Sequence, residues 1–226
     1  MVWIKPVINL IGNFPPMIED ILRAVLGMAP GAKKINLDLA AMRQHCKSLV
    51  EQLIPWEEEK ELELLSLKVN FMTQKRGLDK IVIGTIHSIY YEPMVVFAYK
   101  DYVKGQRDAL LYCRTKNLEF IYRLKRKSTD VYFNGKPVAV LDEAGVLHGN
   151  LSRKVIGGVK IYSSDLLSIM VQGKDIGHMF NPARPHNEQQ RAFFVLADLD
   201  EEDEYILLAL GLFELVTRML ANKKKK

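Results

Sequence analysis

The chain ends with the stretch YILLALGLFELVTRMLA, residues Tyr205 to Ala221, whose large apolar side chains recur on every face of a helix. A helix that is apolar all round has to be buried on all sides, either in lipid or inside a protein. Its 17 residues rise only about 25 Å, which is short for a bilayer but suits the interior of a barrel. We therefore predict that this helix is the core around which the preceding chain folds.

The residues just before this helix are strongly acidic. Asp198 and the run from Asp200 to Glu204 place six carboxylates in seven positions. Carboxylates at a helix N-terminus interact favourably with the helix dipole, and we favour this interpretation. The same cluster offers hard oxygen ligands, so Asp198, Asp200 and Glu202 are the alternative candidates for calcium binding. The EF-hand pattern is not met, because the glycine of the turn and the distal glutamate are absent.

The region from about Glu61 to the acidic run has the pattern of antiparallel strands, because β-branched and aromatic residues are dense between glycine-bearing turns. Alternation in Leu118–Lys125 predicts a strand with one buried face. Asn134-Gly135 predicts a two-residue hairpin turn, since both turn positions need positive φ. The other predicted strands are Leu64–Met72, Ile81–Tyr91, Met94–Tyr102, Ala109–Thr115, Val131–Phe133, Pro137–Val140, Gly158–Tyr162, Leu167–Val171, Ile176–Phe180 and Ala192–Leu196.

The first sixty residues are predicted to be helical. Apolar residues recur at helical spacing after Pro15-Pro16 and again over Asn36–Ile54. We expect residues 1–60 to form a helical extension and residues 61–226 to form a barrel with its central helix at 203–221. The predicted fold class is therefore mainly β: a closed antiparallel barrel of about twelve strands around a buried C-terminal helix, with an N-terminal helical extension.

This design resembles the tubby-like barrel. The hairpin YFNGKPV at 132–138 looks like the strand pairs of that family, and EDEYILLAL at 202–210 is similar to the acidic approach to its buried helix. Phospholipid scramblases, the plant LURP-one-related proteins and the tubby C-terminal domain share about twelve strands closed around one central hydrophobic helix. The resemblance implies a non-enzymatic binding or scaffold module. Tubby-like domains use basic barrel residues to bind phosphoinositides, which implies an anionic membrane surface as the partner.

The densest basic part of the predicted barrel is formed by Arg123, Lys125, Arg126 and Lys127. Such a cluster contributes about 1 kcal/mol per basic residue near an anionic membrane surface, so we predict that it binds anionic lipid. The alternative is a solvated strand end with its loop. RNA binding would need an exposed aromatic platform, whereas alternation puts Tyr122 on the apolar face. Nucleic acid therefore ranks below lipid as a partner.

Composition and charge narrow the class of protein. With 48% hydrophobic and 26% charged residues, the chain belongs to the ordinary folded proteins rather than the disordered or disulfide-rich ones. Lys223 to Lys226 supply four units of the net charge of +5, so the basic balance does not by itself indicate nucleic acid. Cys46 and Cys113 lack metal-ligand spacing and are predicted to be buried free thiols. We find no signal-peptide pattern and expect a cytoplasmic protein, which the lipid prediction places at the periphery of a membrane.

Two other functional classes stay open. One is a peripheral membrane protein that is anchored by its C-terminal helix instead of enclosing it. The other is an enzyme whose site assembles only in three dimensions, because the sequence contains no GxSxG, HExxH, Walker A or GxGxxG motif. Such an enzyme would need His87, His148 or His178 to converge with carboxylates in a cleft. No cofactor other than calcium is suggested by the sequence.

Overall fold

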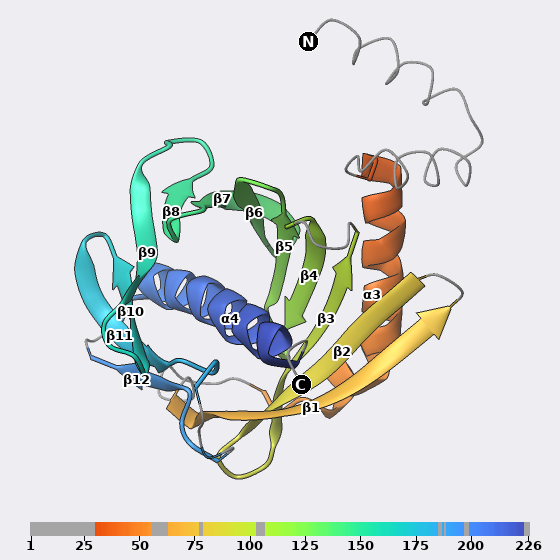
Figure 1. Cartoon of the computed structure of the whole chain (residues 1–226), viewed down its shortest axis with the longest axis horizontal. Helices are drawn as coiled ribbons and strands as arrows, with labels where there is room; N and C mark the ends of the chain where they lie inside the picture. The colour runs from red at the N-terminus through yellow and green to blue at the C-terminus, as the bar shows by residue number, and fades with distance from the viewer. Residues whose placement is uncertain are drawn as a thin grey trace, which may run out of the picture.

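The computed structural model describes residues 30–55, 63–76, 79–102, 107–184, 187, 189–196 and 199–223. Within these residues the chain forms one antiparallel sheet whose strands are paired in chain order, with one helix on the outside and one in the centre (Figure 1). The predicted helix after Pro15-Pro16 lies outside the described residues. The elements are α3 (Ala32–Gln52), β1 (Leu65–Arg76), β2 (Asp79–Ser88), β3 (Pro93–Asp101), β4 (Ala109–Arg114), β5 (Glu119–Leu124), β6 (Ser128–Phe133), β7 (Lys136–Asp142), β8 (Val146–Gly149), β9 (Val155–Ile161), β10 (Leu166–Val171), β11 (Lys174–Phe180), β12 (Phe193–Val195) and α4 (Glu201–Lys223).

The twelve-stranded sheet curls into a nearly closed barrel. The two edges meet where β1 faces the segment before β12: the Leu67 amide donates to the Gln190 carbonyl at 3.0 Å, and the Ala192 amide donates to the Leu65 carbonyl at 2.6 Å. Closure satisfies backbone groups that an open edge would expose. The predicted fold class is confirmed, and each predicted strand overlaps a strand of the structure. Only β8 was not predicted, because its four residues are too few to show alternation.

Helix α4 runs through the middle of the barrel (Figure 1). Twelve of its residues, from Ile206 to Leu220, are buried, which confirms the enclosed apolar helix. The helix begins two residues earlier than predicted and ends two residues later. Asp200 caps its N-terminus, since the Asp200 Oδ1 atom accepts a hydrogen bond from the Asp203 amide at 2.8 Å. All four residues of the first turn are acidic, in agreement with the dipole interpretation.

The two walls of the barrel meet α4 differently. Glycines on β9 and β11 let the helix approach closely: a Cβ atom at Gly157 would lie 3.0 Å from the Ile206 Cγ2 atom. On the other wall the space is filled by aromatic rings. Tyr122 of β5 packs on Phe213 with ring centroids 5.3 Å apart, and its hydroxyl donates to the Ala209 carbonyl at 2.7 Å. Small residues on one wall and large ones on the other therefore fix the position of the helix.

Helix α3 covers the outer face of the sheet and forms a second apolar core there. Met42 and Cys46 of α3, and Leu53 just after its end, are buried against residues of β2 to β5. All six residues of β5 are consequently buried. The prediction of one buried face for Leu118–Lys125 was wrong, because α3 covers the face that the sequence pattern assigned to solvent.

One glycine of α4 gives a prediction whose sign depends on packing. Gly211→Ala would ordinarily stabilise a helix by about 1 kcal/mol. Here the new Cβ atom would lie 2.5 Å from the ring of Phe193, which is 1% exposed and has no room to move. We expect the variant to be less stable by about 1 to 3 kcal/mol in urea unfolding. A second change, Phe193→Leu, should recover part of the loss; a more stable Gly211→Ala variant would contradict this packing.

Candidate binding site

Two sets of charged side chains hold α3 against the barrel. The first is buried: Lys100 of β3 reaches Asp38 of α3, with the Nζ and Oδ1 atoms 2.9 Å apart, and both side chains are less than a tenth exposed. Lys34 approaches the same Oδ1 atom at 3.4 Å. A buried carboxylate is tolerated only when it is paired in this way. Asp38 therefore fixes the N-terminal half of α3 on the outer face of β3.

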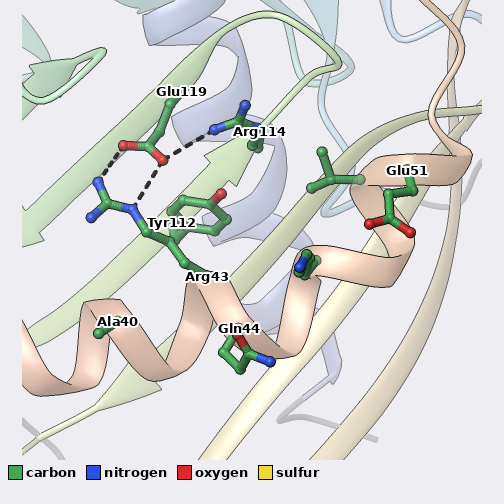
Figure 2. A pocket seen from close by; sticks show the side chains of 9 residues that line it. Ala40, Arg43, Gln44, Glu51, Tyr112, Arg114 and Glu119 are labelled. Atoms are coloured by element: carbon green, nitrogen blue, oxygen red, sulfur yellow. Dashed lines mark hydrogen bonds and ion pairs between the residues drawn. The ribbon is translucent and has the colours of Figure 1, made fainter.

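The second set is centred on Glu119 of β5. The Arg43 guanidinium of α3 donates to both carboxylate oxygens of Glu119, and the Arg114 Nη1 atom lies 3.4 Å from the Oε2 atom (Figure 2). The Glu119 hydrogen bond is the main cause that raises the pKa of Arg43 above its ordinary value. A fork of this kind fixes orientation as well as distance. The middle of α3 is thus held over β4 and β5.

The surface between α3 and the barrel is hollowed on both sides of Arg43. The first hollow has a volume of about 710 Å³ and lies beside the N-terminal half of α3; we call it the Tyr132 hollow. The second has a volume of about 580 Å³ and lies beside the C-terminal half of α3 (Figure 2); we call it the Tyr112 hollow. Both volumes are in the range of small-molecule sites. The residues around the Tyr132 hollow are mostly apolar, among them Pro30, Ala32, Ile35, Leu39, Leu110, Ile121 and Tyr132.

The structure separates the predicted basic cluster into two parts. Arg123 is 6% exposed and pairs with Asp108, with the Nη2 and Oδ1 atoms 2.6 Å apart. It is therefore a buried residue of the barrel wall, because β5 is covered by α3 on that face. Lys125, Arg126 and Lys127 are exposed in the loop between β5 and β6. Arg123 and Lys125 both line the Tyr132 hollow, and Lys125 forms an ion pair with Asp130.

The calcium candidates are not gathered into a metal site in the part of the chain that the structure describes. Asp200 uses its Oδ1 atom to cap α4, and Glu202 is an exposed residue of the first turn. Asp198 lies outside the described residues. Within those residues there is no group of three His, Cys, Asp or Glu side chains that could hold a metal ion.

Among the residues that the structure describes, the histidines and cysteines do not form a common site. His148 pairs with Asp142 at 3.1 Å, and His178 pairs with Asp175 at 3.2 Å; in each pair the two residues are close in sequence. Burial is the main cause that lowers the pKa of His87. Cys46 and Cys113 are buried free thiols as predicted. Burial raises the pKa of Cys46 to about 12, so its thiol stays protonated at neutral pH.

The residues that position α3 were not predicted from the sequence, although one signal was present. Asp38 stands in line with Met42 and Cys46, at spacings of four residues, and therefore on the buried stripe of the helix. A carboxylate on an apolar stripe indicates a buried ion pair. Its partner Lys100 could not be found in this way, because it lies 62 positions further along the chain.

The barrel with its C-terminal helix is compatible with the tubby-like architecture. No protein-family model matches the chain, and neither curated proteins nor solved structures gave a match. No helix in the described ranges is long and apolar enough to cross a membrane. The apolar side chains of α4 are enclosed by the barrel. The helix therefore presents no exposed apolar face with which it could anchor the protein in a membrane.

Proposed function

We propose that this protein is a non-enzymatic binding module of the tubby-like type, related in design to the scramblase and LURP-one proteins. Its partner is an anionic membrane surface, and its contact is the β5–β6 loop at Lys125, Arg126 and Lys127. The protein then works at the periphery of a membrane on the cytoplasmic side. Arg123 lines the same hollow, but its guanidinium is buried against Asp108 and is not assigned to the headgroup contact.

The observation that carries the proposal is the position of the loop beside the Tyr132 hollow. Three exposed basic residues follow one another in the loop, and the first of them lines an apolar hollow of about 710 Å³. Cations attract the lipid headgroups, while an adjoining apolar surface accepts the hydrocarbon part of the lipid. The pair between Lys125 and Asp130 is half exposed on the lysine side. Such an exposed pair contributes little to the free energy of folding. A lipid phosphate can therefore replace the Asp130 carboxylate as the partner of Lys125 at small cost.

Vesicle co-sedimentation of the full chain tests the proposal. We expect binding to vesicles that contain phosphatidylserine, no binding to neutral phosphatidylcholine vesicles, and a decline as salt is raised, because salt screens charges at the surface. Replacing Lys125, Arg126 and Lys127 by glutamine should weaken binding by about 3 kcal/mol, roughly a hundredfold in affinity.

The matched control changes the same number of charges elsewhere. Lys154, Lys160 and Lys174 are exposed residues on or beside β9 and β11, on the opposite wall of the barrel (Figure 1). Their replacement by glutamine should leave most of the binding intact. Equal losses in the two triple variants would indicate attraction by net charge alone, and indifference of the wild type to anionic lipid would overturn the proposal.

A further inference from the structure

The Tyr112 hollow is separate from the loop that is proposed to contact lipid. It is bounded by α3 on one side and by β4 and β5 on the other (Figure 2). Three cations line it, Arg43, Lys47 and Arg114, against two carboxylates, Glu51 and Glu119. The hollow therefore holds an excess of positive charge.

The two carboxylates leave one positive charge of the hollow unmatched. Glu119 is already held by Arg43 and Arg114 together, and its side chain is only 10% exposed. Glu51 is an exposed residue near the end of α3, and Figure 2 shows it far from Tyr112 and Arg114. The region around Tyr112 is consequently richer in hydrogen-bond donors than in acceptors.

Two of these donors have N–H groups without an acceptor among the described residues. The buried Nε atom of Arg114 has no hydrogen-bond acceptor among the described residues. Lys47 forms no ion pair within the described part of the chain and is exposed at the edge of the hollow. Tyr112 is 2% exposed, its hydroxyl accepts a hydrogen bond from the Arg114 side chain, and burial raises the pKa of that hydroxyl to about 12. At neutral pH the phenol keeps its proton and can donate it to an acceptor.

The chemistry of these donors defines the ligand. A guanidinium, an ammonium and a phenol together fit a group with several anionic oxygens, and a guanidinium fork matches the planar edge of a carboxylate or a phosphate. Ala40, Val50 and the Tyr112 ring add apolar contact, and the volume exceeds what a bare ion fills. We infer that the Tyr112 hollow binds a small organic molecule whose carboxylate or phosphate group is held by Arg114, Lys47 and the Tyr112 hydroxyl.

Titration calorimetry and thermal unfolding of the full chain test this site with three probes at equal ionic strength. Succinate carries the carboxylate, glycerol 3-phosphate carries the phosphate, and glycerol is the uncharged control. We expect saturable binding and a higher melting temperature with one or both anions and no effect of glycerol, because a ligand that binds only the folded state stabilises it. Which anion binds more tightly distinguishes the two sources of the oxyanion.

Variants connect the binding to the named donors. Lys47→Met and Tyr112→Phe each remove one donor while keeping most of the side chain, and each should weaken anion binding about tenfold. Lys33→Met is the matched control, since Lys33 is an exposed lysine of α3 that does not line the hollow. Absence of saturable binding by the wild type, or unchanged affinity in both donor variants, would overturn the inference. The inference is independent of the lipid contact: Lys47→Met should leave vesicle binding unchanged, so either proposal can fail alone.

Discussion

Leu212→Asp should unfold the barrel or leave it only marginally stable. Leu212 is fully buried in the middle of α4, and the side chains around it belong to the core of the whole sheet. A carboxylate at this position would have neither a cation nor water beside it, which costs several kcal/mol. Since small folded domains have only about 5 to 15 kcal/mol of stability, one such change consumes a large part of it.

Leu37→Asp is the control for the same chemical change. Leu37 belongs to α3 and is 59% exposed, so its replacement should alter the free energy of unfolding by less than about 1 kcal/mol. Urea unfolding of both variants and of the wild type is to be monitored by circular dichroism. A cooperative transition of Leu212→Asp near the wild-type midpoint would mean that α4 is not enclosed.

The central helix and the hairpins could be predicted because their signals are local. The apolar residues of Tyr205–Ala221 lie on one continuous stretch of chain, and no partner has to be known to infer that they are buried. The turn at Asn134-Gly135 is equally local, and both residues have positive φ in the structure, 45° and 78°. Local pattern was therefore sufficient for eleven of the twelve strands and for the enclosed helix.

The candidate sites could not be predicted because they depend on where α3 lies. Alternation predicted that Arg123 lies on the exposed polar face of its strand. That face is buried because α3 packs on it. The Tyr112 hollow combines residues of α3 with residues of β4 and β5 that come much later in the chain. Arg43 and Glu119, for example, are 76 positions apart. Pairing over such distances leaves no periodic signal in one sequence.

Arg123→Met should destabilise the protein by about 3 to 5 kcal/mol, because it leaves the buried Asp108 carboxylate without its cation. The side chains of Arg123 and Asp108 are each 7% exposed, and the Arg123 Nη1 atom also donates to the Ala109 carbonyl at 3.0 Å. The measurement is the free energy of unfolding in urea. The double variant Arg123→Met with Asp108→Leu should recover much of the loss, since no unpaired charge is left.

Lys125→Met, two positions away, separates the two halves of the basic cluster. Its ion pair with Asp130 is half exposed, so its loss should cost at most about 1 kcal/mol. If Arg123→Met were as mild as Lys125→Met, the guanidinium would not be buried and could join the loop in binding lipid. The predicted difference in unfolding free energy between the two variants means that Arg123 stabilises the barrel wall under α3, whereas Lys125 is a surface residue. Vesicle binding by Arg123→Met at a temperature where it stays folded should then equal that of the wild type.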